Sequence, residues 1–281
     1  MKNYYSIKQI DKELLRYLDK KPELAKVIEL YRKIFSIQES ARQKAKPALE
    51  VSLDEAFKNL KSGRYILEGM APVVDAELFL ETAKAIGEAF SEVSGEPFPV
   101  DRLLALPEFQ PESIDKLVDK AVKDDIAFIK RLAKESSYNE ETMSLFIFSL
   151  LAPFFQKEAE KYQEVFEKAA WHQGHCPFCG SQPQYSRFHE EDGRRLLFCP
   201  LCRSQWRFSR MVCPFCHNSD HTGLRHFCIE ENSTHRADVC DKCHRYLKAT
   251  NERASGKEAI PQVENIVTIA LDYLADKEGF K

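Results

Sequence analysis

The chain has 281 residues, of which 43% are hydrophobic and 30% are charged, and its formal net charge is −3. This balance is typical of a globular protein and argues against a disordered chain. The small negative charge also argues against a protein that works mainly by clamping a polyanion. The start of the chain has no basic segment followed by an apolar run, and the most apolar stretch, 143–155, is shorter than the roughly 20 residues of a membrane helix. We therefore expect no membrane span and a cytoplasmic location.

The first part of the chain shows helical periodicity. Ser52 and Glu55 form a capping-box pattern, and Asp75 is a suitable N-cap for a helix that Gly95 would end. Pro153 should kink or split a long helical pattern, because proline cannot donate the backbone hydrogen bond of a helix interior. Further helical patterns cover about 8–19, 22–45, 112–134 and 140–169. This half of the chain therefore predicts a helical bundle.

Cysteine and histidine are confined to the next part of the chain. All nine cysteines lie between Cys176 and Cys243, all eight histidines lie between His172 and His244, and the first 170 residues contain neither. Both residue types are common metal ligands, so their clustering indicates a boundary near Trp171 between a helical region and a metal-binding region.

The cysteine region has little helical signal until its end. Short β-type runs lie at 195–198 and 206–208, between turn-rich segments. A last helix should begin at Pro261 and end at Gly279, since its apolar residues keep i, i+3, i+4 spacing. Those apolar residues are Val263, Ile266, Val267, Ala270, Leu271 and Leu274.

Eight of the nine cysteines form four C-x2-C pairs. In chain order the spacing is C-x2-C-x19-C-x2-C, followed by C-x2-C-x23-C-x2-C. The two thiolates of one pair can reach one ion when the chain turns tightly, and two such turns supply the four ligands of a tetrahedral zinc or iron site. We expect consecutive pairs to share an ion, and an interleaved cross-brace is the alternative. The candidate metal ligands are Cys176, Cys179, Cys199, Cys202, Cys213, Cys216, Cys240 and Cys243.

Other interpretations of the cysteines fit the sequence less well. Disulfides need an oxidising compartment, for which no targeting signal is present. Thiol redox catalysis by a C-x2-C motif needs a βαβ context, which is missing. A four-thiolate site is closed, so metals bound here should be structural rather than catalytic. Cys228 is left over and is expected to be a small buried residue, with a reactive thiol as the alternative, and the nearby histidines are not expected to replace a thiolate.

Arginine and aromatic residues gather around the second cysteine pair. Arg203, Arg207 and Arg210 alternate with Trp206 and Phe208. Protein interface cores favour this mixture, so the segment is a candidate partner-binding surface. The alternative is a solvated face with one core tryptophan.

Three segments resemble the formate dehydrogenase accessory proteins, the FdhE family. The segment 171–180, WHQGHCPFCG, is similar to the family motif W-x2-G-x-C-P-x-C-G. The segments 196–216 and 240–248 resemble the motifs L-x-C-x-L-C-x3-W-x3-R-x2-C-x2-C and C-D-x-C-x2-Y-L-K, and the last helix also fits. The sequence departs from the family at His217 and His244, where glycine is common. The resemblance is specific from about 171 to 280 and only general over the helical half.

The resemblance implies an α-helical N-terminal domain followed by two rubredoxin-like, or zinc-ribbon-like, metal modules and a C-terminal helix. The implied domains are 1–171, 172–212 and 213–281. The eight paired cysteines carry over as ligands of two metal ions, iron or zinc, and the likeness to rubredoxin favours iron.

The resemblance also implies a function. It is a non-catalytic, cytoplasmic role in the maturation of formate dehydrogenase, in which the protein binds the catalytic subunit and its metals are structural or redox-responsive; a homodimer is left open. An enzyme has little support, because the sequence offers no catalytic carboxylate pair, nucleophile elbow or phosphate-binding loop. A nucleic-acid-binding zinc-ribbon protein is the alternative function, favoured by the Arg-Trp-Arg-Phe stretch and opposed by the overall acidity.

Overall fold

The N-terminal half of the chain is helical, as predicted. The structure is a computed structural model that describes residues 5–70, 72–122, 126–230 and 233–281. The helices of this half are α1 (Ile7–Leu18), α2 (Ala25–Lys44), α3 (Leu53–Lys61), α4 (Ala76–Ser94), α5 (Val100–Leu104), α6 (Ile114–Val122), α7 (Ile126–Ser136), α8 (Glu140–Ala159) and α9 (Gln163–Lys168), with 3-10 turns at Pro22–Leu24, Pro107–Phe109, Pro111–Ser113 and Glu160–Tyr162. Ser52 and Asp75 cap α3 and α4 as predicted, although α3 has only one of the two hydrogen bonds of the predicted capping box, from the Glu55 N–H to the Ser52 side chain, and Gly95 ends α4 with a left-handed φ of 78°. The pattern predicted over 112–134 corresponds to α6 and α7, and its middle, 123–125, lies outside the described residues.

Helix α8 continues through Pro153, so of the two predicted effects of this proline, a kink or a split, the split is wrong. A proline leaves the carbonyl four residues earlier without its usual helical donor. That carbonyl, of Ser149, accepts a hydrogen bond of 2.8 Å from Nε2 of Gln38 on α2. A side chain from another helix thus replaces the missing backbone donor, and the helix is interrupted only at the turn Glu160–Tyr162.

The cysteine region is built on one six-stranded sheet with the strand order β3-β2-β1-β6-β5-β4. Its strands are β1 (Tyr185–Phe188), β2 (Arg195–Phe198), β3 (Gln205–Phe208), β4 (Leu224–Phe227), β5 (His235–Cys240) and β6 (Arg245–Asn251), and a 3-10 turn, His221–Gly223, precedes β4. β1 and β6 pair in parallel, and all other neighbours are antiparallel. The first cysteine pair precedes β1 and the second joins β2 to β3, whereas the third precedes β4 and the fourth joins β5 to β6. The two modules therefore share the sheet through β1 and β6. The domain boundaries proposed from the sequence stay a prediction.

The C-terminal helix is interrupted once, which the sequence did not predict. Its parts are α11 (Pro261–Val267) and α12 (Ile269–Lys277), and they follow the short α10 (Glu252–Ser255). Between them Thr268 has φ −106° and ψ 22°, and its hydroxyl donates a hydrogen bond of 2.6 Å to the carbonyl of Glu264. Threonine hydroxyls that bond back to the previous turn often bend helices. Across the described residues, the structure has no helix with both the length and the apolar character needed to cross a bilayer.

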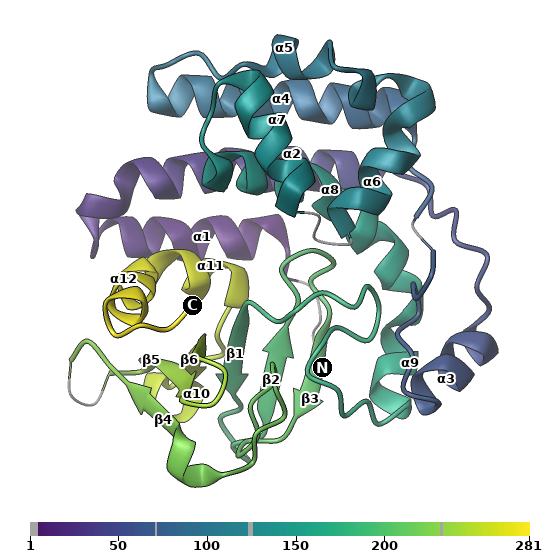
Figure 1. Ribbon diagram of the computed structural model, residues 1–281. Helices are drawn as coiled ribbons and strands as arrows, with labels where there is room; N and C mark the ends of the chain where they lie inside the picture. The colour runs from purple at the N-terminus through teal and green to yellow at the C-terminus, as the bar shows by residue number, and fades with distance from the viewer. Residues whose placement is uncertain (1–4, 71, 123–125, 231–232) are drawn as a thin grey trace.

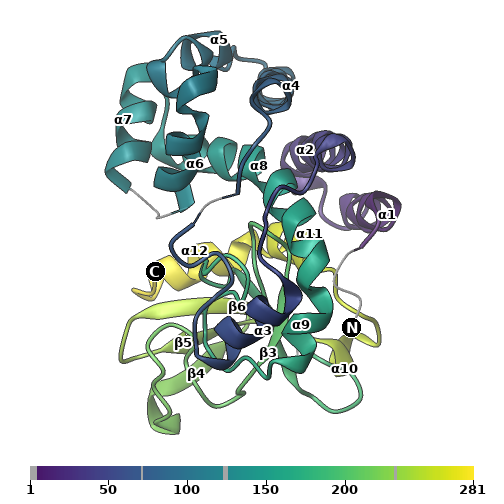
Figure 2. The ribbon, with the colours of Figure 1, turned by 90° about the vertical axis from the view of Figure 1, so that its right-hand side faces the viewer.

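The helical half lies against the sheet through the C-terminal helices. Figures 1 and 2 show α4, α2, α1 and α11 following one another toward the sheet. A single hydrophobic core runs through these layers and includes residues from both halves of the chain, such as Ile28, Phe155, Phe178, Trp206 and Val263. The helical half and the metal region are therefore packed against each other.

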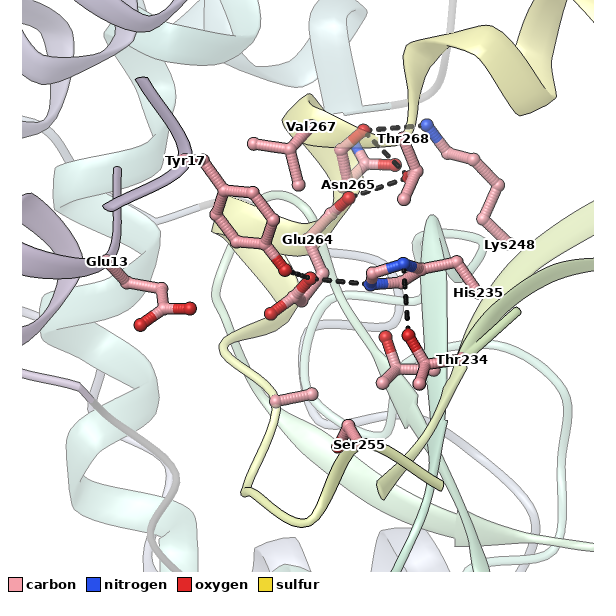
Figure 3. Close-up of polar contacts among 12 residues, drawn as sticks. Glu13, Tyr17, Thr234, His235, Lys248, Ser255, Glu264, Asn265, Val267 and Thr268 are labelled. Carbon is pink, nitrogen blue, oxygen red and sulfur yellow. Dashed lines mark hydrogen bonds and ion pairs between the residues drawn. The ribbon is translucent and has the colours of Figure 1, made fainter. Parts of the chain in front are cut away.

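A buried polar network also joins α1, α11 and β5 (Figure 3). The carboxylate of Glu264, 1% exposed, accepts a hydrogen bond of 2.7 Å from the Tyr17 hydroxyl and lies 2.8 Å from Nε2 of His235. Burial acts to raise the pKa of Glu264, but the hydrogen bond and charge of His235 and the hydrogen bond from Tyr17 keep it below its usual value. The network therefore favours an ionised Glu264 at the contact between the two halves.

Candidate metal centres

All four C-x2-C pairs lie on turns of the same geometry. The residue after the second cysteine has a left-handed φ between 55° and 76°, and its N–H donates to the carbonyl of the first cysteine at 2.9–3.1 Å. These residues are Gly180, Arg203, His217 and His244. Gly180 is the one glycine among the four, and the histidines at the two positions where glycine is common in the family adopt the same positive φ. A non-glycine residue in this conformation costs about 1–2 kcal/mol, so other contacts must stabilise three of the four turns.

The first two pairs bring four sulfur atoms together inside the protein. Sγ of Cys176 lies 3.4 Å from Sγ of Cys202, and Sγ of Cys179 lies 3.5 Å from Sγ of Cys199. The four sulfurs all lie within 4.8 Å of one another, and the four residues are at most 3% exposed. This group is closed to solvent.

The last two pairs form a second group that is more open. Sγ of Cys213 lies 3.7 Å from Sγ of Cys243, and Sγ of Cys216 lies 3.7 Å from Sγ of Cys240. These four sulfurs also lie within 4.8 Å of one another, but Cys216 and Cys243 are partly exposed. The structure thus has the consecutive grouping of pairs and not the interleaved one.

The spacing of the sulfurs suits a tetrahedral metal ion. Zinc–sulfur bonds of about 2.3 Å place the corners of a tetrahedron about 3.8 Å apart, which is close to the separations in both groups. All nine cysteines are free, so neither group is a pair of disulfides. Burial raises the pKa of the Cys176 and Cys213 thiols, and a bound cation would reverse this by favouring thiolates. Each group could bind one metal ion, and the ligand set suits zinc or iron.

Polar groups that the sequence analysis missed surround the sulfurs. Oγ of Ser181 lies 3.2 Å from Sγ of Cys179, and Oγ of Ser204 lies 3.1 Å from Sγ of Cys202. Nδ2 of Asn218 lies 3.8 Å from Sγ of Cys240. Such donors stabilise thiolate ligands. All three residues stand two positions after a second cysteine, so the repeated pattern C-x2-C-x-[S/N] was the available signal.

Close backbone contacts fix the first turn in place. The N–H groups of Ile66 and Leu67, which follow α3, donate to the carbonyls of Pro177 and Phe178 at 3.0 and 2.9 Å. A side chain at Gly180 would lie 2.8 Å from the ring of Tyr65, so this position needs glycine for space as well as for its φ. The helical half therefore contributes directly to the geometry of the first cysteine group.

Gly174 joins the two cysteine groups. A Cβ at this position would overlap the carbonyl oxygen of Pro214 and lie 2.6 Å from its carbonyl carbon. Gly174 stands just before the first pair and Pro214 lies within the third, so the glycine allows one turn to contact the other. The close approach of Pro214 therefore explains why glycine stands at this position of the motif.

The remaining predicted residues have mixed outcomes. The histidines, all in the described part of the chain, join neither cysteine group. Cys228 lies outside both groups and is partly exposed, not buried as predicted. Arg203 does not share a surface with Arg207, because its guanidinium donates to Oε1 of Gln38 at 2.8 Å and lies over the ring of Phe35 on α2. Trp206 is a core residue whose Nε1 donates to the carbonyl of Gln173.

Known proteins share both the motifs and the fold. Residues 175–210 match the family model described as FdhE, central domain. The chain is 29% identical over 172 residues to the FdhE homolog of Aquifex aeolicus strain VF5. This match covers 60% of this chain and 59% of that protein. It is 31% identical over 176 residues to the FdhE homolog of Pasteurella multocida strain Pm70, covering 60% of this chain and 55% of that protein. The matches thus span less than two thirds of these relatives.

A solved structure extends the likeness to nearly the whole chain. The crystal structure of the FdhE protein from Pseudomonas aeruginosa aligns with a TM-score of 0.66 and 18% identity, over 98% of this chain and 92% of that one. At this identity the match shows a shared fold. With the family model and the relatives, it shows that the chain is similar to FdhE proteins in its cysteine motifs and in its fold.

Proposed function

We propose that the chain is an accessory factor for the maturation of formate dehydrogenase, and that it binds the catalytic subunit of that enzyme in the cytoplasm during assembly. The likeness to FdhE proteins supports the general role. The observation that carries the proposal is the pair of four-cysteine groups, because four thiolates give a metal ion the full ligand number of a structural site and leave no coordination position for a substrate. The role is therefore one of recognition and not of catalysis.

We further propose that the eight paired cysteines bind two metal ions, and that these ions stabilise the binding surface. Four of the six strands have only four residues, so the sheet has few hydrogen bonds per strand pair. Structural metals contribute their binding free energy directly to folding. A metal at each group would fix the ends of the strands and the loops that follow them.

Replacing Cys176 and Cys179 together with serine tests the proposal. In cells that lack their own copy of the gene, the double variant should fail to restore formate dehydrogenase activity, because the first metal site would lose two of its four ligands. Cys228→Ser is the matched control, since this cysteine lies outside both groups. Full activity from a double variant that accumulates to the wild-type level would contradict the proposal. Metal analysis and the visible spectrum of anaerobically purified protein distinguish iron from zinc.

Capture experiments address the proposed partner. The wild-type chain should retain the catalytic subunit from cells that assemble formate dehydrogenase, and the double variant should retain less. Equal retention of the catalytic subunit by the two proteins would show that partner binding does not depend on the first metal site.

A further inference from the structure

A cleft lies between the helical half and the metal region, and the proposed function does not use it. Its volume is about 460 Å³, which is within the range of small-molecule sites. Helices α2 and α8 contribute its lining residues from the helical half. The other lining residues come from α11, the end of β2, the segment before β1 and the turn of the second cysteine pair. The cleft therefore exists only when the two halves are packed together.

The walls of the cleft are mainly apolar, and several of them are aromatic. Tyr31 and Phe35 on α2, Phe148 on α8 and Phe198 on β2 all line it. The ring centroids of Tyr31 and Phe35 lie 5.7 Å apart. Aromatic rings pack well against a flat guest, because stacked and edge-to-face contacts both bury a large apolar area. The walls therefore suit a planar ligand.

Carboxamides supply most of the polar groups in the cleft. Five of them line it, and no described lining residue is a carboxylate, a lysine or a histidine. The five are Gln38, Gln182, Gln184, Gln262 and Asn265. The amide of Gln38 is already used, because it accepts a hydrogen bond from Arg203 and donates one to the carbonyl of Ser149. The other four amides have no hydrogen bond within the described part of the chain. Each of these four is free to bind a ligand, and each offers both a donor and an acceptor.

Two of the free amides have a buried oxygen without a partner. Gln262 is 8% exposed, and neither its Oε1 nor the Oδ1 of Asn265 has a hydrogen-bond partner. The two residues are three positions apart on α11, so they lie on the same face of the helix. Buried acceptors in proteins are rarely left unsatisfied, because the loss of hydration costs free energy. A half-turn of either amide exchanges its oxygen with its nitrogen and can bring the oxygen to the cleft. This pair indicates a ligand with neighbouring N–H donors.

Helix α2 offers a donor to the same cleft. The hydroxyl of Tyr31 has no hydrogen bond within the described residues. Burial, together with the charge of Asp272, raises the pKa of Tyr31, so the hydroxyl stays protonated at neutral pH and can donate. A ligand in the cleft thus meets two acceptors on α11 and a donor on α2.

The charges at the cleft narrow the class of ligand further. Arg203 is the one charged residue among the described lining residues, and its guanidinium already donates to Gln38 and lies 5.2 Å from the ring centroid of Phe35. A ligand held mainly by its phosphates would need more free cations, and a cationic ligand would need a carboxylate. A hydrocarbon chain would leave the amide oxygens unsatisfied. An uncharged, planar heterocycle meets all of these conditions.

Guanine has the matching edge. Its N1–H and N2–H groups are neighbouring donors, and its O6 is an acceptor beside them, whereas the corresponding edge of adenine has one donor group beside an acceptor. We propose that the cleft binds a planar nitrogen heterocycle with the hydrogen-bonding edge of guanine. Its N–H donors would bond to Gln262 and Asn265, and its faces would pack against the aromatic walls.

Nucleosides test the proposal on the unmodified protein. Guanosine is the probe, because it carries this edge without a phosphate, and its binding to the full chain is followed by isothermal titration calorimetry. One molecule should bind per chain. Inosine, which lacks only the 2-amino group, should bind at least about tenfold more weakly, and so should adenosine, because a site built to hydrogen-bond a donor rejects an analogue without it.

Two variants test the amides on α11. Gln262→Leu and Asn265→Leu should each weaken guanosine binding by about tenfold or more. Neither should lower the urea midpoint, because an apolar side chain of similar size replaces a buried amide that has no partner for its oxygen. Gln43→Leu is the matched control, since Gln43 is exposed on α2 and does not line the cleft, and it should leave the affinity unchanged.

Three results would overturn the proposal. The first is no guanosine binding at millimolar concentration, which would show that the amides bind only water. The second is equal affinity for guanosine and inosine. The third is unchanged guanosine affinity in both leucine variants. If these variants unfold at lower urea concentration, the comparison of nucleosides on the wild-type chain still decides. None of these measurements depends on a role in formate dehydrogenase maturation, so either proposal can fail without the other.

Discussion

The contact between Gly174 and Pro214 predicts that Gly174→Ala damages the second metal site, although Gly174 is next to the first. The added methyl group would overlap the Pro214 carbonyl oxygen and approach its carbonyl carbon to 2.6 Å. Both sides of this contact are backbone, so no side-chain rotation relieves it. Overpacking typically costs about 1–3 kcal/mol. Because no side chain can rotate away here, we expect about 3 kcal/mol, which lowers the ratio of folded to unfolded molecules roughly a hundredfold.

The segment that moves should be the turn containing Pro214, because the second cysteine group is partly exposed and the first is buried. Purified Gly174→Ala should therefore contain less than two metal ions per chain and should unfold at a lower urea concentration than the wild type. Gly223→Ala is the control, since a methyl group there makes only ordinary contacts of 3.5 and 3.8 Å. Wild-type metal content and urea midpoint in Gly174→Ala would refute the reasoning.

Two more predictions follow from exposure and charge. A chelator should remove metal in two kinetic phases, because the more open cysteine group should lose its ion first. The variant Cys216→Ser should therefore abolish only the faster phase. A single phase that Cys216→Ser leaves unchanged would contradict this prediction. Glu264→Gln should destabilise the protein at pH 7, and the difference from the wild type should shrink as the pH falls below about 4.5, the ordinary value for a glutamate, toward the lower folded pKa of Glu264. Urea unfolding of both proteins from pH 7 to pH 4 measures this difference, and a difference that grows on acidification would show that ionised Glu264 does not stabilise the fold.

The features that the sequence predicted well depend on neighbouring residues. The C-x2-C turns, the caps at Ser52 and Asp75 and the strand at 195–198 each follow from a few consecutive residues. The grouping of the cysteines into two sets of four was also predictable, because short loops between the pairs favour the sharing of one ion by consecutive pairs. Hydrophobic periodicity located most helices for the same reason, since one turn of a helix determines the next.

The features that the sequence did not predict depend on distant residues. Gln38 accepts a hydrogen bond from Arg203 and donates one to Ser149, so one side chain both buries an expected surface arginine and preserves α8 through Pro153. Neither hydrogen bond can be predicted from the residues that neighbour Gln38 in the sequence. The parallel pairing of β1 with β6 is equally hidden, because it joins strands from two modules that look independent in the sequence.

That pairing means that the two metal sites should not act independently. β1 follows the first cysteine pair, and β6 follows the last, so a metal ion bound at each group would fix one strand of the parallel pair that holds the sheet together. Arg195 on β2 adds a second link, because it donates to the carbonyl of Val212 beside Cys213 and pairs with Asp238 on β5. Loss of a metal ion from the more exposed group would loosen β5 and the segment after β3, because Arg195 contacts Asp238 in the one and Val212 in the other.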